Sequence, residues 1–290
     1  MVRIEYKAPQ TLDEAVQLLS SCTDKAAKVL AGGTDLIIQL RQQVNNPHLI
    51  VDLKKIPEMM QASLTDDGLS IGPALCCAEL TAREDIKAVF PGLVEAAYLI
   101  GSTQIQGRAS IGGNLCNSSP AADAIPALIA LQAECVILGP GGRRRVAAED
   151  FVTGVQTNVL AKDEVLVEIV VPRPAAMSAD AYLRFIPRTE MDIAVAGAGV
   201  NVSLDGDGVC TAARVAIGAV APTALLVREA AAALIGTKLE EPALQAAGEA
   251  ASAASKPITD RRGTIEFRKH IVGVLTRRAA STAAKRAKEK

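Results

Sequence analysis

Aromatic side chains are scarce in this chain of 290 residues, because Phe, Tyr and Trp together make up 2% of it and Trp is absent. Proteins that bind nucleic acids stack bases on aromatic rings and hold phosphates on basic surfaces. Here 31 basic and 32 acidic residues leave a net charge of −1. The composition therefore argues against a nucleic-acid partner.

Metal-binding patterns are also missing. The chain has only two His, His48 and His270, and six Cys of which no two have C-x-x-C spacing. The six are Cys22, Cys76, Cys77, Cys116, Cys135 and Cys210. We therefore expect no zinc site or iron–sulfur cluster held by this chain alone, and reduced, mostly buried thiols of a cytosolic protein.

Long hydrophobic runs are lacking as well. The stretch Ala124–Leu131 is among the longest and is far shorter than a membrane span requires. The first ten residues, MVRIEYKAPQ, show neither the apolar core of a signal peptide nor a twin arginine. We expect a cytoplasmic protein with no membrane span.

The length and the 49% hydrophobic content suit two domains with sizeable cores. Pro172-Arg173-Pro174 is the best boundary, since proline interrupts helices and central strands. We predict a mixed α/β (α+β) domain over residues 1–174 and a small sheet with helices over residues 175–290.

Periodicity and turn signals predict the elements within each domain. In the first domain we expect helices at Thr11–Leu19, Leu36–Arg41 (a single turn), Glu79–Ala88, Pro91–Ile100 and Pro120–Leu131, and strands at Lys28–Leu30, Leu49–Leu53, Leu69–Ile71, Cys135–Leu138 and Val165–Val171. In the second we expect strands at Ala181–Pro187, Ala194–Leu204 and Val209–Ala219, then helices from Ala224 and a frayed basic tail at Ala283–Lys290.

Two glycine loops carry the chemistry. The first runs Val29-Leu30-Ala31-Gly32-Gly33-Thr34-Asp35-Leu36, and its paired glycines follow a strand. Such a loop can aim backbone N–H groups at a phosphate that no Cβ obstructs, although a Gly-Gly turn by itself is weak evidence. Neither G-x-G-x-x-G nor Gly-Lys-Ser/Thr is present, so a dinucleotide here belongs to neither the Rossmann nor the P-loop class.

The second loop begins Ser110-Ile111-Gly112-Gly113-Asn114 and ends at Asp123. It again pairs glycines with short hydrogen-bond donors. Asp123 has two open interpretations: an acceptor for sugar or ribityl hydroxyls, or the N-cap or first-turn acid of the following helix. Two such loops in one domain favour a cofactor that contains a diphosphate.

At these residues the chain resembles the FAD-binding subunits of the molybdenum hydroxylases, the family of xanthine dehydrogenase and carbon monoxide dehydrogenase. The matching stretches are Ala31–Leu36, Gly101–Asn114, Ser119–Asp123, Arg188–Ala194, Asp260–Arg262 and Phe267-Arg268. The resemblance implies an N-terminal FAD domain of the vanillyl-alcohol-oxidase (PCMH) type with two subdomains. A C-terminal domain like that of the CO dehydrogenase flavoprotein, a small antiparallel sheet with helices, is implied to follow.

The resemblance also implies roles for single residues. Val29, Leu30, Ala31, Gly32, Gly33, Thr34, Asp35 and Leu36 would wrap the FAD diphosphate, and Ser110, Ile111, Gly112, Gly113 and Asn114 would hold it from the other side. Asp123 would bond cofactor hydroxyls, and Leu166 and Ile100 would contact FAD unless they serve only in core packing. Arg184 stands where many relatives carry a lysine near the flavin, and the resemblance implies a cofactor contact there, made by a guanidinium with the same charge but a different geometry.

The implied function is electron transfer. The molybdenum cofactor would sit on a large partner subunit and two [2Fe-2S] clusters on a small one, in a dimer of heterotrimers, and this chain would pass electrons through FAD to NAD, a quinone or another acceptor. No catalytic side chain of the Ser-His-Asp kind is expected. Two alternatives stay open: a stand-alone FAD oxidase of the same fold, and a flavin-free scaffold subunit. The sequence names neither the substrate nor the acceptor.

Overall fold

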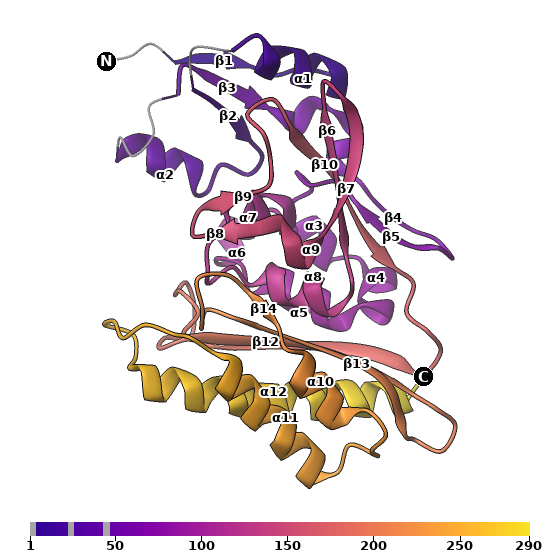
Figure 1. Cartoon of the computed structure of the whole chain (residues 1–290). Helices are drawn as coiled ribbons and strands as arrows, with labels where there is room; N and C mark the ends of the chain where they lie inside the picture. The colour runs from indigo at the N-terminus through magenta and orange to yellow at the C-terminus, as the bar shows by residue number, and fades with distance from the viewer. Residues whose placement is uncertain (1–3, 23–25, 43–46) are drawn as a thin grey trace.

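The computed structural model describes residues 4–22, 26–42 and 47–290. Three sheets follow one another along the molecule, and Figure 1 shows the N-terminal sheet at the top, a five-stranded sheet with helices in the middle and the C-terminal sheet below. The expected mixed fold of helices and small sheets is confirmed.

The N-terminal lobe is built on a parallel sheet of order β1-β3-β2. Its strands are β1 (Glu5–Lys7), β2 (Ala27–Leu30) and β3 (Leu49–Asp52), and its helices are α1 (Leu12–Ser20) and α2 (Leu36–Arg41). The predicted start of α1 is confirmed, because the Thr11 hydroxyl accepts from the Glu14 N–H at 3.2 Å and the Glu14 carboxylate accepts from the Gln10 N–H at 2.9 Å.

The second sheet is antiparallel, in the order β4-β5-β10-β6-β7. Its strands are β4 (Ala62–Leu64), β5 (Gly68–Ile71), β10 (Val165–Pro172), β6 (Glu134–Gly139) and β7 (Gly142–Ala147), and a small ribbon of β8 (Val152–Gly154) and β9 (Thr157–Asn158) lies nearby. The sequence did not predict β7, whose arginines Arg143–Arg145 are exposed. Charged residues suit this position, because β7 is an edge strand.

Short helices pack against this sheet. They are η1 (Leu53–Lys55), η2 (Pro57–Met60), α3 (Cys77–Thr81), α4 (Glu84–Val89), α5 (Pro91–Tyr98), α6 (Thr103–Gln106), α7 (Ile111–Asn117), α8 (Ala124–Ala130) and α9 (Ala148–Phe151). The single helix predicted at Glu79–Ala88 is wrong, because the chain is extended at Arg83 between α3 and α4. The Arg83 side chain turns to Asp85 and to the carbonyl of Ala62, so a tertiary contact accompanies the break.

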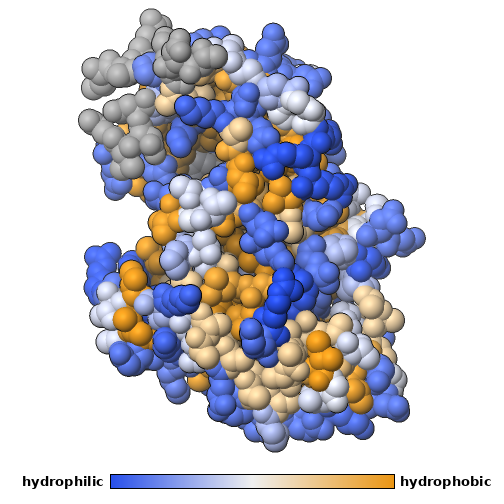
Figure 2. Space-filling view, viewed as in Figure 1, coloured by the Kyte–Doolittle hydropathy of each residue, from blue (hydrophilic) through white to orange (hydrophobic). Residues whose placement is uncertain are grey.

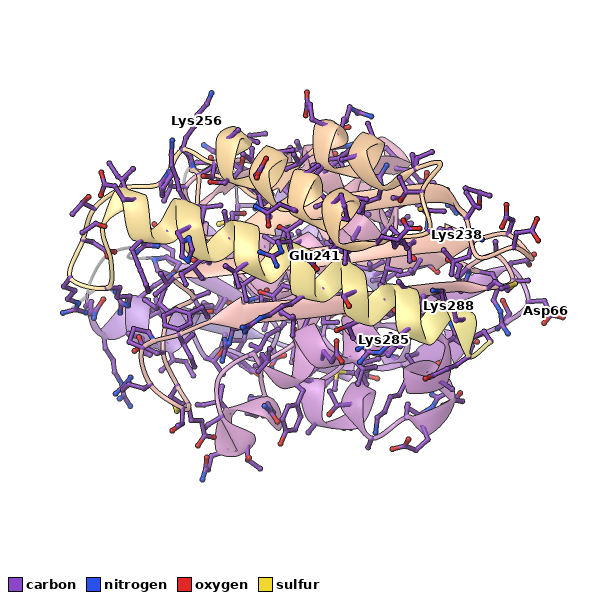
Figure 3. The ribbon with its side chains drawn as sticks, turned by 90° about the horizontal axis from the view of Figure 1, so that it is seen from below. Asp66, Lys238, Glu241, Lys256, Lys285 and Lys288 are labelled. Atoms are coloured by element: carbon purple, nitrogen blue, oxygen red, sulfur yellow. The ribbon has the colours of Figure 1, made fainter. Side chains whose placement is uncertain are left out.

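The C-terminal part is a four-stranded antiparallel sheet between two layers of helices. It contains β11 (Ser178–Phe185), β12 (Ala196–Leu204), β13 (Cys210–Gly218), β14 (Leu225–Leu226), α10 (Arg228–Leu234), α11 (Glu241–Ala254) and α12 (Ile265–Lys288). Figure 3 shows α12 from below, laid across the strands with Lys285 and Lys288 at its far end. Helices α5 and α8 contact the same sheet, on the side that Figure 1 shows facing the middle of the molecule.

The prediction of a frayed basic tail is wrong. Helix α12 continues to Lys288, and its residues Ala283, Ala284 and Ala287 are buried. Arg286 forms an ion pair with Glu95 of α5. The buried alanines and the Arg286 ion pair together hold this segment against the sheet and α5.

Helix α8 lies very close to β12 and β13. All seven of its residues are buried. A Cβ at Gly199 would meet the carbonyl oxygen of Pro126 at 2.6 Å, and one at Gly218 would meet the Pro126 ring at 2.7 Å. Only glycine leaves room for this contact, which joins the helices of the middle part of the molecule to the C-terminal sheet.

Two glycines also meet where α11 crosses α12. A Cβ at Gly248 would lie 2.7 Å from the Gly273 carbonyl oxygen, and one at Gly273 would lie 2.9 Å from that of Gly248. We predict that Gly248→Val destabilises the chain by about 1–3 kcal/mol, because the helices must separate to admit the side chain. The thermal unfolding midpoint measures this.

Gly206→Val is the control for that substitution, since nothing lies within 4 Å of a Cβ at Gly206. An unchanged or higher midpoint for Gly248→Val would contradict the packing argument, because replacing a helix-interior glycine is otherwise favourable.

A buried carboxyl lies between α5 and β11. Asp180 accepts a hydrogen bond from the Leu93 N–H at 2.9 Å, while its other oxygen, Oδ1, has no hydrogen-bond partner. Burial raises the pKa of Asp180 to about 6, and the nearby Glu95 adds to the rise although backbone N–H groups oppose it. Folding therefore makes the Asp180 carboxyl harder to ionise than it is in the unfolded chain.

From this shift we predict a pH-dependent stability difference. A raised folded-state pKa gives stability that is complete below pH 4 and is lost as the pH rises through about 6. Asp180→Asn removes the titration, so its unfolding midpoint should rise relative to wild type between pH 4 and pH 7. Asp66→Asn, at an exposed position, is the control. A constant difference between wild type and Asp180→Asn across this range would refute the assignment.

Candidate functional site

A pocket opens where the two glycine loops meet. Thirteen of the predicted residues line it: Val29, Ala31, Gly32, Gly33, Thr34, Asp35, Leu36, Ile100, Ser110, Gly112, Gly113, Asn114 and Leu166. They come from the N-terminal lobe, from the helical region and from β10 of the second sheet. Figure 2 shows hydrophobic side chains at the surface in the middle of the molecule, framed by hydrophilic ones.

The first loop leaves β2 at Leu30 and enters α2. A Cβ at Gly32 would lie 2.0 Å from the carbonyl oxygen of Arg108, so this loop rests directly on the backbone before the second loop. Gly33 has φ of +80°, a conformation that favours glycine. One glycine is therefore required by space and the other by backbone conformation.

The second loop is held by backbone contacts with the segment at the start of α3. Ser110 pairs with Cys76 in an isolated bridge, and the Cys77 N–H donates to the carbonyl of Ala109 at 2.7 Å. The Ser110 hydroxyl oxygen caps α7 by accepting from the Gly113 N–H at 3.0 Å. A Cβ at Gly112 would lie 2.4 Å from the Cβ of Pro73, so here too the backbone packs too closely to admit a side chain.

Sequence reasoning missed several lining residues: Lys28, Gln39, Leu53, Met59, Pro73, Ala74, Ala109, Cys116, Asn117, Leu160, Glu164 and Val165. Gln39 and Asn117 join the two loops, since the Gln39 amide donates to Asn117 Oδ1 at 3.1 Å. Helical spacing from Asp35 and from Asn114 was the signal available for this pair, because residues three or four apart share a face.

The pocket offers backbone donors rather than a cluster of cations. No carbonyl in the described part of the chain accepts from the N–H groups of Gly32, Gly33 or Thr34. Partial burial raises the pKa of Asp35. Glu164 is already paired with Arg144, which holds the pKa of its carboxyl below the usual value. Such a donor set suits a diphosphate that approaches glycine backbone.

Four predicted residues lie outside this lining. Leu30 and Ile111 are packing residues: the Leu30 side chain lies against Gly33, and Ile111 is buried in the main core. Asp123 and Arg184 instead meet each other, with Arg184 Nη1 donating to Asp123 Oδ2 at 2.6 Å and both side chains less than a tenth exposed. Their predicted contacts with the cofactor remain predictions.

The environment of Asp123 bears on its two interpretations. It occupies the N-cap position of α8, yet its side chain caps no N–H, and Asn114 Oδ1 accepts from the Ala124 N–H at 3.1 Å in its place. The Tyr182 hydroxyl donates to Asp123 at 2.9 Å. Burial raises the pKa of Asp123 to about 6, while Arg184 and Tyr182 pull it down. The capping role therefore belongs to Asn114.

Two family models account for most of the chain. Residues 2–174 match the FAD binding domain in molybdopterin dehydrogenase, and residues 181–283 match the CO dehydrogenase flavoprotein C-terminal domain. The chain belongs to the FAD-binding subunits of the molybdenum hydroxylases. The resemblance noted from the glycine loops is thereby confirmed, and with it FAD as the cofactor of this oxidoreductase subunit.

Individual relatives of this FAD-binding subunit agree. It is 34% identical to the carbon monoxide dehydrogenase medium chain of Hydrogenophaga pseudoflava, over 97% of each chain. It is 32% identical to the nicotinate dehydrogenase FAD-subunit of Eubacterium barkeri, over 85% of this chain and 84% of the relative. A solved structure of carbon monoxide dehydrogenase from H. pseudoflava superposes with a TM-score of 0.93 at 36% identity, covering 98% of both chains.

The described residues contain neither a candidate membrane span nor a candidate metal site. None of their helices combines the length and apolar character needed to cross a membrane. Within the same residues, no group of three or more His, Cys, Asp or Glu side chains is placed to hold a metal ion.

The close contact of Gly32 with the Arg108 carbonyl predicts that adding one methyl group at Gly32 weakens FAD binding. Gly32→Ala places a Cβ against the Arg108 carbonyl, so the first loop must move away from the second. We expect the FAD dissociation constant to rise about tenfold or more, a loss of at least ~1.4 kcal/mol. Flavin fluorescence on titration with FAD measures it.

Gly107→Ala is the matched control, because nothing lies within 4 Å of a Cβ at Gly107. Equal affinities for the two variants would show that the close approach at Gly32 does not position the cofactor.

Proposed function

We propose that this chain is the electron-transferring flavoprotein subunit of a molybdenum hydroxylase complex. The observation that supports this best is the pocket itself. It is lined by Gly32 and Gly33, whose N–H groups donate to no carbonyl of the described residues, and by Ser110 and Gly113 of the second loop. When bound, FAD would take electrons from [2Fe-2S] clusters on a partner and deliver them to NAD, a quinone or another acceptor.

The chain's own residues would bind and orient the cofactor. The N–H groups of the first loop would hold the diphosphate, and the segment Ser110–Asn114 would hold it from the other side. Leu166 and Ile100 would supply apolar contacts. We retain Asp123 and Arg184 as proposed contacts of the cofactor, which would require their side chains to be reached from the pocket.

The remaining assignments follow from the relatives. The medium chains of carbon monoxide dehydrogenase are among the relatives matched over nearly their whole length. We therefore propose a large molybdenum-cofactor subunit and a small [2Fe-2S] subunit as partners, in a cytoplasmic dimer of heterotrimers. We also propose that residues 1–174 and 175–290 are the two domains. The separate core formed by β11–β13 and α10–α12 supports this division.

A stand-alone oxidase with a covalent flavin receives no support from the histidines. Neither His48, which precedes β3, nor His270, within α12, lines the pocket. The flavin-free scaffold requires a chain that folds and assembles without FAD, and the cofactor content of the purified complex tests this directly.

The test is to co-express the chain with its co-encoded neighbours, record the visible absorption spectrum, and release the cofactor by denaturation. We expect about one FAD per chain, released without proteolysis because it is not covalently bound. A colourless, correctly folded complex would exclude the electron-transfer function and leave the scaffold. Flavin that stays on the denatured chain would favour the covalent oxidase.

A further inference from the structure

A charged cluster lies behind the first glycine loop. Asp52 ends β3, and Lys54 follows in η1. The Lys54 ammonium donates to Asp52 Oδ1 at 2.6 Å and to the carbonyl oxygen of Ala31 at 2.7 Å. On the other side of the carboxylate, the Tyr6 hydroxyl of β1 donates to Asp52 Oδ2 at 2.6 Å. Strands β1 and β3 are thereby linked to the start of the loop.

The ion pair of Lys54 with Asp52 is largely shielded from solvent. The side chains of Lys54 and Asp52 are only 19% and 9% exposed. Asp52 Oδ1 also accepts from the Lys54 backbone N–H at 3.0 Å, so both ends of the lysine are fixed to one carboxylate. Burial alone would raise the pKa of Asp52, but the bonds from Lys54 and Tyr6 hold it below its usual value. These bonds therefore favour the ionised carboxylate of Asp52.

The bond to Ala31 fixes one peptide plane. The carbonyl of Ala31 and the N–H of Gly32 belong to the same trans peptide and point in opposite directions. Ala31 and Gly32 both line the pocket, whereas Lys54 is not among the lining residues. When Lys54 holds the carbonyl, the N–H of Gly32 is directed away from the lysine, and a carbonyl dipole is kept from facing an anion.

We propose that Lys54 is a positioning residue for FAD: it holds the Ala31 carbonyl behind the loop, so that the Gly32 N–H is set for the cofactor diphosphate. This inference rests on the proposed function of the pocket. Asp52 and Tyr6 orient the lysine, and none of the three touches the cofactor. Without the hydrogen bond from Lys54 the peptide between Ala31 and Gly32 can rotate. FAD binding must then order this peptide, and the entropy cost of doing so weakens the affinity.

The test measures the FAD dissociation constant by flavin fluorescence, on the full chain with its partner subunits. Lys54→Met keeps the length and removes the donor, and should weaken FAD binding about tenfold or more. Lys54→Arg keeps charge and donor, and should restore most of the affinity. Lys55→Met, at the exposed neighbouring position, removes the same charge from the same turn and should leave binding unchanged.

A second variant separates positioning from stability. Lys54→Met alone leaves Asp52 buried without its cation, which destabilises the fold. The double variant Asp52→Asn with Lys54→Met removes both charges, so its unfolding midpoint should recover while FAD affinity stays low. Recovery of affinity in the double variant would overturn the proposal, because Lys54 would then act only on stability.

The two failures are distinguishable. Unchanged FAD affinity in Lys54→Met, with a wild type that binds FAD, would overturn the positioning role alone. A wild type that takes up no FAD would overturn the proposed function, and this inference with it.

Discussion

The close contact of helix α8 with the C-terminal sheet is the constraint on which the rest of the structure depends. Pro126 of α8 lies against Gly199 and Gly218, where no side chain fits between helix and strand. The first turn of the same helix is capped by Asn114 of the second glycine loop. The loop that borders the pocket is therefore held in place by a packing contact on the far side of the helix, and the C-terminal domain supports a site that it does not line.

The pocket is made of backbone more than of side chains. Gly32 lies against the carbonyl of Arg108 and Gly112 lies against Pro73, and both glycines line the pocket. A site of this kind needs support from behind, because glycine-rich backbone has the most conformational freedom to lose. Lys54 provides this support for the first loop, and the bridge between Ser110 and Cys76 provides it for the second.

Sequence patterns predicted the parts of the fold that follow from local rules. The start of α1 after Thr11 and the three strands β11–β13 are confirmed. The errors share one cause, which is that distant contacts overruled the local pattern. Three arginines in β7 do not resemble a strand until the sheet places them on an exposed edge, and the basic end of α12 is ordered by buried alanines and by Arg286 against Glu95.

The sequence by itself determined the two glycine loops and, through them, the family and the cofactor. Gly32 and Gly112 occupy positions where a Cβ would meet neighbouring backbone, and Gly33 adopts a positive φ, so residue type alone marks these positions in the sequence. Only the tertiary structure decided how the site is held. The pairing of Asp123 with Arg184, the bridge from Gln39 to Asn117 and the bond from Lys54 to Ala31 join residues 61, 78 and 23 positions apart. Such contacts depend on how the chain packs, which no local pattern encodes.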